Sequence, residues 1–215
     1  EVGTVTPLKQ LGNSKPRIFR LEQDQALINR LGFNNDGIKV IKDRIISEKN
    51  NGILGINIGP NKNTKDQTND FALGLKSFLN IADYITINIS SPNTEGLRDF
   101  HNKKKLNDLL KSLNKIKNEE KKNIPILLKI SPDISDNHIS EIVTIAIENS
   151  ISALILTNTT NANRDNLTSD SKNEEGGLSG EPLQKISTDM IKKFYKELKG
   201  KIPIIGVGGV NSGKA

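Results

Sequence analysis

The sequence predicts an α/β protein with the (β/α)₈ architecture of a TIM barrel, on three observations. Short β-branched runs alternate with longer polar segments whose apolar residues lie three or four positions apart. From the second run onward this order is uninterrupted, which implies a parallel sheet with helical crossovers. Five of the runs end in polar or glycine clusters, each at the carboxyl end. A barrel brings all such ends to one mouth, whereas a doubly wound sheet joins only those at its switch point.

Each predicted element follows from its local pattern. The strands are rich in Val, Ile, Leu and Thr, which suit a pleated and buried surface. The helices show apolar spacing of three or four, and Asp136 and Ser187 are candidate N-caps. The predicted strands are residues 1–5, 53–58, 84–89, 126–130, 153–157 and 204–207, and the predicted helices are 37–48, 66–79, 104–116, 138–149 and 183–198.

The segment before the second strand breaks this alternation. It contains the run PRIFRLEQDQALINRLGFNNDG and is typical of an insertion with loop or small-hairpin structure. A chain of 215 residues with 34% hydrophobic content can bury one sizeable core, which fits one domain better than two. We therefore expect one barrel domain over residues 1–215, with an inserted segment at about 6–36.

The amino-acid composition excludes several classes of site and partner. The chain has no cysteine, and its two histidines, His101 and His138, are far apart. The chain therefore has too few histidines for a histidine metal site or a Ser-His-Asp triad, and we predict no metal. The net charge of +6 suggests nucleic acid, but the lysines are mixed with acids on helical segments and aromatic residues make up only 4%. We therefore expect no nucleic-acid partner. No window is apolar enough for a transmembrane helix.

Residues 84–94, YITINISSPNT, form the clearest candidate site. The apolar alternation ends in small polar side chains, and Pro92 cannot donate to a β-ladder. Taken alone, this pattern fits an ordinary turn, because Ser, Pro and Asn are common turn residues. The polar clusters at four other strand ends reverse that interpretation. Asn88, Ser91 and Asn93 are then candidate site residues that share one mouth of the barrel.

The other strand ends supply further candidates. Lys129 lies in the apolar run ILLKIS. It therefore lies either at the mouth of the barrel or in the interior, where burying its charge costs free energy. Residues 208–214, GGVNSGK, have P-loop spacing, but Ala215 replaces the Ser or Thr that would bind magnesium. A phosphate seat of backbone amides fits that turn better. The remaining candidates are Asn57, Gly59, Thr157, Asn158, Thr159, Gly206, Gly208 and Gly209.

Eight blocks in order resemble the dihydroorotate dehydrogenases of the quinone-dependent, membrane-associated class. They are EVGTVTP, INRLGFNNDG, GINIGPNK, INISSPNTEGLR, LLKISPD, LILTNTT, GGLSGEPL and PIIGVGGV, and together they cover essentially the whole chain. The class is indicated by Ser91 at the base position, where another class has cysteine, and by the INRLGFNN block. The resemblance implies FMN-dependent oxidation of (S)-dihydroorotate to orotate in de novo pyrimidine synthesis, with electrons passed to a quinone.

The same resemblance implies individual roles. Ser91 would take a proton from the substrate; serine alone is a poor base, so we expect a relay through Thr94 or an ordered water, with Phe33 closing over the site. Substrate binding would fall to Asn29, Arg30, Leu31, Gly32, Phe33, Asn88, Asn93, Asn158 and Thr159. FMN binding would fall to Asn57, Asn88, Lys129, Thr157, Gly180 and Gly209.

The resemblance also implies parts that this sequence lacks. Members of the class begin with helices that dock on the membrane and shape the quinone tunnel, followed by a first barrel strand, and they end with an eighth strand. We therefore expect an incomplete barrel, with about six of eight strands, that is neither a stable monomer nor active alone. The expected location is peripheral, on the cytoplasmic side of a bacterial inner membrane, with the mitochondrial inner membrane as the alternative.

Two other functions stay open. The first is a different FMN-dependent barrel oxidoreductase that acts on another planar or carbonyl substrate. The second is a non-catalytic barrel fragment that binds a phosphorylated ligand through Gly208 and Gly209. Ser91 and Lys129 at matching strand ends argue against the second.

Overall fold

A parallel sheet forms the body of the protein in the computed structural model, which describes residues 1–48, 52–94, 96–162 and 164–213. Each predicted strand is present, with small shifts at its ends. Strands in such a sheet are buried on both faces and need continuous apolar runs, and every residue of β4 and β7 is buried. The strands, in their order across the sheet, are β1 (Val2–Val5), β4 (Gly55–Ile58), β5 (Tyr84–Asn88), β6 (Ile126–Ile130), β7 (Ala153–Leu156) and β9 (Ile204–Gly206).

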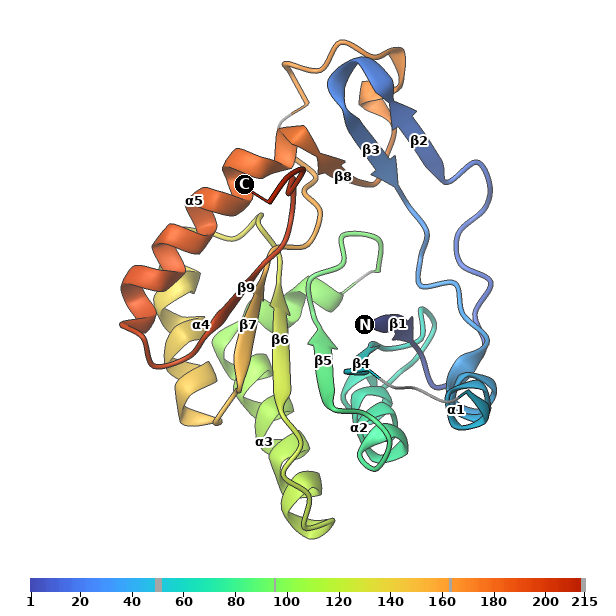
Figure 1. Cartoon of the computed structure of the whole chain (residues 1–215), viewed down its shortest axis with the longest axis vertical. Helices are drawn as coiled ribbons and strands as arrows, with labels where there is room; N and C mark the ends of the chain where they lie inside the picture. The colour runs from blue at the N-terminus through green and yellow to red at the C-terminus, as the bar shows by residue number, and fades with distance from the viewer. Residues whose placement is uncertain (49–51, 95, 163, 214–215) are drawn as a thin grey trace.

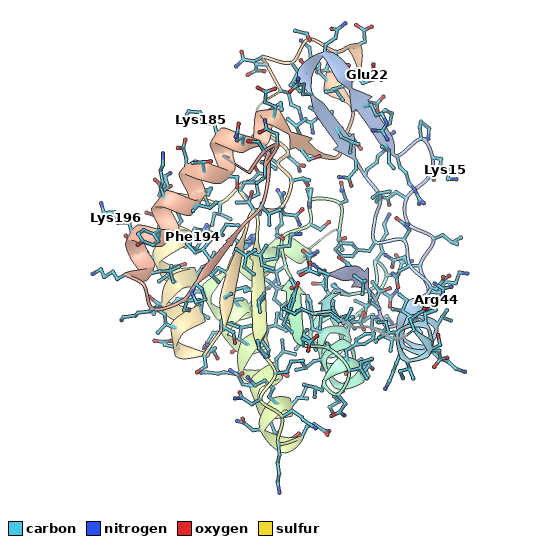
Figure 2. All side chains as sticks on the ribbon, viewed as in Figure 1. Lys15, Glu22, Arg44, Lys185, Phe194 and Lys196 are labelled. Atoms are coloured by element: carbon cyan, nitrogen blue, oxygen red, sulfur yellow. The ribbon has the colours of Figure 1, made fainter. Side chains whose placement is uncertain are left out.

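Helices connect these strands and cover the outer side of the sheet (Figure 1). Their apolar faces join the strands in one large core; in α3, Leu106, Leu109 and Leu113 are buried at helical spacing. Lys185 and Lys196 extend from α5 into solvent (Figure 2), so the basic residues there form a solvated face. The helices are α1 (Gly37–Ser47), α2 (Gln67–Phe78), α3 (Lys103–Glu119), α4 (Asp136–Glu148) and α5 (Glu181–Leu198).

Both predicted N-caps are wrong. Ser135 is the N-cap of α4, and Asp136 is the first residue inside that helix. Ser187 lies inside α5, because the helix already begins at Glu181, and its hydroxyl donates to the carbonyl of Val207 over 2.6 Å. A serine in a helix interior can use its hydroxyl for such a tertiary contact. Ser187 therefore ties α5 to the segment that follows β9.

A second, antiparallel sheet lies beyond the carboxyl ends of the parallel strands (Figure 1). Its hairpin, β2 (Ile18–Leu21) and β3 (Ala26–Asn29), turns through the short 3₁₀ helix η1 (Glu22–Asp24) and occupies the inserted segment. The third strand, β8 (Gly177–Gly180), pairs with β3 and was not predicted, because a glycine-rich sequence carries no strand pattern. We call this β2–β3–β8 sheet the cap.

The parallel sheet is open rather than closed. Within the described residues, β1 pairs with β4 alone and β9 pairs with β7 alone, so these two strands form the edges. All polar strand ends nevertheless face the cap, because every pair in the sheet is parallel. No described helix combines the length and the apolar character that crossing a membrane requires.

Candidate functional site

A cavity of about 400 Å³ opens at the carboxyl ends of the parallel strands. Strands β1, β4, β5, β6 and β7, or the residues directly after them, supply one side, and the segment after β3 supplies the other. Ends that are distant in the sequence thus meet at one mouth, as in a barrel. The predicted site residues on its wall are Asn29, Leu31, Gly32, Phe33, Asn57, Asn88, Ser91, Asn93, Lys129, Asn158 and Thr159.

Side-chain hydrogen bonds join the strand ends along this wall. Thr4 Oγ1 donates to Asn57 Oδ1 over 2.8 Å, and Asn88 Nδ2 donates to Thr4 Oγ1 over 3.0 Å. Ser90 Oγ donates to Asn88 Oδ1 over 3.0 Å, and Asn158 Nδ2 donates to Ser90 Oγ over 2.9 Å. Each amide is therefore held by a residue from another strand or from the loop after β5. Such a network fixes the pattern of donors and acceptors before any molecule binds.

Ser91 lies on the same wall and is 5% exposed. Its Oγ accepts a hydrogen bond from the backbone N–H of Asn93 over 3.2 Å, which leaves its hydroxyl proton and a second lone pair for a bound molecule. Asn93 Nδ2 donates to the carbonyl of Asn29 over 3.1 Å, so the loop after β5 is tied to the end of β3. Thr94 is also buried. No hydrogen bond joins it to Ser91 in the described part of the chain, and the relay through Thr94 stays a prediction.

Lys129, the fourth residue of β6, contributes a cation to the wall. Burial lowers the pKa of Lys129 from its ordinary value, and the carboxylate of Glu1 opposes that change. Within the described residues its ammonium forms no ion pair. A desolvated cation that forms no ion pair favours a bound group that carries or develops negative charge.

Amide side chains hold the segment after β3 over the cavity. Asn35 Nδ2 donates to the carbonyl of Phe33 over 2.7 Å, and Gln10 Nε2 donates to the carbonyl of Gly32 over 2.8 Å. Phe33 has a φ of 54°, a left-handed conformation that is uncommon for a bulky residue. Its ring packs beside Gly59, where an added Cβ would come within 3.1 Å of Phe33 Cε2. The close packing of ring and strand end positions Phe33 at the cavity.

Arg30 and Thr157 do not line the cavity. Arg30 lies between two cavity residues, and successive side chains of an extended segment point to opposite sides. Its Nη1 is 2.7 Å from Glu174 Oε2, and its guanidinium lies 4.6 Å from the centre of the Phe19 ring. Arg30 thereby lines a neighbouring hollow of about 940 Å³ that also contacts Asn93. Thr157 is 2% exposed, and its hydroxyl donates to the carbonyl of Asn158 over 3.0 Å.

Gly180 and Gly209 meet at a separate hollow of about 430 Å³ beside the first turn of α5. Their φ values are 97° and 73°, where side chains are strained. A Cβ on Gly209 would come within 2.7 Å of the backbone nitrogen of Gln184, so only glycine allows this approach. Exposed amides at a helix N-terminus suit an anion such as phosphate. The last residues of the GGVNSGK pattern, Lys214 and Ala215, lie outside the described residues.

Sequence reasoning missed two residues that organise the wall, Thr4 and Ser90. Thr4 lies near the carboxyl end of β1, and the rule that selected Asn57 and Asn88 would have selected it too. Ser90 precedes the expected base, and only the structure shows that it bonds to the asparagines. No cluster of three or more His, Asp or Glu residues in the described ranges could hold a metal ion. The other unpredicted wall residues are Glu1, Gly3, Asn34 and Pro92.

Known proteins resemble this chain over its whole length. The family model described as dihydroorotate dehydrogenase matches residues 1–215. A protein of Bartonella tribocorum named "Dihydroorotate dehydrogenase (quinone)" is 47% identical over 98% of this chain and 59% of its own length. One of Idiomarina loihiensis with the same name is 46% identical over 99% and 65%, respectively. The ligand-free dihydroorotate dehydrogenase structure from Eimeria tenella superposes with a TM-score of 0.93 at 38% identity, covering all of this chain and 66% of that one.

The fold and the cavity define an α/β protein of the TIM-barrel class with a polar ligand site at the carboxyl ends of its strands. The chain belongs to the dihydroorotate dehydrogenase family. It spans about three fifths of the length of the curated relatives it matches. The barrel is not closed within the described residues, as the sequence predicts.

Proposed function

We propose that the protein containing this chain oxidises dihydroorotate to orotate, uses FMN as its cofactor and passes the electrons to a quinone. One observation carries the proposal: a serine, several oriented asparagines and a desolvated lysine line the same cavity at the strand ends. Its relatives carry the name of this activity.

The wall suits a small planar ring with amide edges and a carboxylate. Such a ring presents both donors and acceptors at its rim, and a primary amide offers both. Asn29, Asn88, Asn93 and Asn158 supply these amides from four different segments of the chain. Because hydrogen bonds to Thr4 and Ser90 fix the orientation of Asn88 and Asn158, binding costs little further ordering.

Ser91 is proposed as the base that accepts the proton from the carbon beside the substrate carbonyl. Its Oγ is oriented by the amide of Asn93, and a proton acceptor must lie within hydrogen-bond reach of the proton it takes. Phe33, packed over the cavity, is proposed to exclude water from the ring once it is bound. Thr94 is proposed to carry the proton onward.

The residues present fit FMN at two separated places. Lys129 supplies a desolvated cation on the cavity wall, and Gly180 and Gly209 supply a tight backbone seat for a phosphate at the start of α5. A flavin bound there would supply the acceptor for the hydride equivalent that the substrate loses. Asn57 would contact the flavin, and Thr157, which is buried, would support that wall.

Quinone reduction and membrane attachment belong to the same proposal. The relatives' names include quinone, and the class implies a peripheral position on the cytoplasmic side of an inner membrane. Sedimentation of the complete protein with liposomes, with and without quinone in the bilayer, tests this part separately from the chemistry.

Two neighbouring serines provide the test of the chemical step. In the complete, flavin-loaded protein, S91A should abolish the bleaching of flavin absorbance on anaerobic mixing with dihydroorotate while FMN stays bound. S90A is the matched control: it removes a hydroxyl from the asparagine network and should weaken orotate binding without abolishing bleaching. Unchanged flavin reduction in S91A would contradict the proposal. An orotate-induced change in the flavin spectrum separates this substrate from other ligands of flavin barrels.

A further inference from the structure

One carboxylate outside the cavity contacts two segments that carry site residues. Asp133 follows β6, and its side chain is 18% exposed. Its Oδ1 accepts a hydrogen bond from Thr160 Oγ1, and its Oδ2 accepts one from the backbone N–H of Asn161 over 2.9 Å. Oδ2 also lies 3.1 Å from Arg98 Nη2. Asp133 therefore links the segment after β5 to the segment after β7.

Both contacted segments carry residues of the cavity wall. Arg98 lies in the short 3₁₀ helix η2 (Leu97–His101), which follows Ser91 on the loop after β5. Thr160 directly follows the asparagine–threonine pair on the wall and is fully buried. Its backbone exchanges two hydrogen bonds with Leu178 of β8, of 3.1 and 2.7 Å. Asp133 thus reaches the cap as well, through Thr160.

The surroundings make Asp133 the natural counter-charge of Arg98. The Arg98 side chain is 27% exposed, and among the described residues its buried Nε and Nη2 make no hydrogen bond, so Nη2 meets Asp133 as an ion pair only. His101, on the same short helix, is buried, and burial together with the charge of Arg98 lowers its pKa to about 4. It is therefore neutral near pH 7. Loss of one member of such a partly buried pair leaves an uncompensated charge.

We propose that Arg98 and Asp133 are positioning residues that lock the Ser91 segment against the Asn158 segment. Neither residue lines the cavity. Their link sets the separation between the proposed base and the amides that hold the ring. The contacts alone carry the structural link, whereas its effect on the reaction rests on the proposed function. Misplacement by about 1 Å can cost about 100-fold in rate, so a link behind the wall can act strongly.

Amide hydrogen exchange and flavin reduction together test this link in the complete, flavin-loaded protein. R98M should speed exchange in residues 91–101 and 158–161, weaken orotate binding, and slow flavin reduction by dihydroorotate about 10- to 100-fold, with FMN still bound. R98K, which keeps the charge, should recover part of each loss. K105M is the matched control: it removes the exposed Lys105–Asp99 ion pair of 2.9 Å from the same region and should change none of the three readouts.

T160V provides a second variant if R98M does not fold, because it removes one hydroxyl at nearly constant volume. It should shift the same readouts in the same direction by a smaller factor. The proposal is overturned if R98M, or T160V in its place, matches K105M in exchange, or if exchange rises while orotate binding and flavin reduction stay unchanged. The S91A experiment is independent of this outcome: bleaching in S91A would remove the proposed function and leave the structural link standing.

Discussion

The parallel sheet and the cap are stabilised in different ways. The parallel sheet buries a continuous core in which Ile58, Ile87 and Phe78 are fully inaccessible. The cap has a small core of its own, made of Leu21, Ile28, Leu167 and Leu178. Burial of apolar surface scales with area, so the cap draws much less stabilisation from this source.

Polar contacts hold the segment before β8 together and tie it to the cap. Arg164 donates to the carbonyls of Lys172, Glu174 and Gly176 over 3.0, 3.0 and 2.6 Å. Asp24 accepts hydrogen bonds from the backbone of Thr168 and Ser169. Regions with few buried apolar contacts open at lower cost than the whole fold. The cavity therefore lies between a rigid sheet and a cover that we expect to open locally.

The largest expected effect comes from paired deletions in the two cores. I58A should lower the free energy of unfolding of the complete protein by about 2–5 kcal/mol, because it leaves a void in a fully buried site. L178A should instead speed exchange of the cap amides and leave the urea midpoint almost unchanged. Equal shifts of the midpoint in both variants would show that the cap and the sheet unfold as one unit.

Acid should weaken the sheet side through His101. Burial and the charges of Arg98 and His138 lower the folded-state pKa of His101 from 6.5 to about 4, while Asp133 acts in the opposite sense. Between these values the unfolded chain binds the proton more readily, so stability is present above about pH 6.5 and is lost as the pH falls towards 4.

The loss should be on the order of 3 kcal/mol in this window. Urea unfolding at pH 7, 5.5 and 4 measures it. H101Q should flatten the difference, and H138Q, which removes a smaller contribution than burial or the charge of Arg98, should keep most of it. If the free energy of unfolding of H101Q depended on pH as strongly as that of the wild type, the effect would belong to other groups.

A medium effect is expected from the main clamp of the cap. R164M removes three charge-assisted hydrogen bonds and should lower the free energy of local opening of the cap by about 1–3 kcal/mol. Exchange of the β3 and β8 amides under native conditions reports this energy. R164K, which keeps a cation but loses the fork of donors, should be intermediate. Faster exchange in the parallel strands as well would contradict independent opening.

The smallest effect should come from Asp24 at the edge of the cap. The hydrogen bond from the Thr168 backbone lowers the pKa of Asp24, a residue that is partly exposed. D24N should speed exchange only at the amides of Thr168 and Ser169, with no change in the urea midpoint. D189N, which removes an exposed ion pair with Lys185 on α5, is the control and should leave those amides unaffected.

Local patterns predicted the parallel sheet well. A run such as residues 126–130 must be apolar whatever its neighbours are, because both faces are covered, and it became β6 without any shift. Asn88 and Lys129 were found because a polar side chain at the carboxyl end of a buried run is costly to bury unless it faces a site. The cap strand β8 was not found, because its residues, GLSG, pair with a hairpin about 150 positions earlier in the chain.

The sequence by itself determined the class of fold, the end of the sheet that carries the site, and the serine, lysine and asparagines that face it. Each follows from chemistry within a few residues of a strand. Only the tertiary structure decided which side chains share the cavity. Arg30 pairs with Glu174 instead, Gly180 and Gly209 line a separate hollow, and Arg98 pairs with Asp133. Those choices depend on strand pleat, register and long-range pairing, which bring together groups whose positions in the sequence are unrelated.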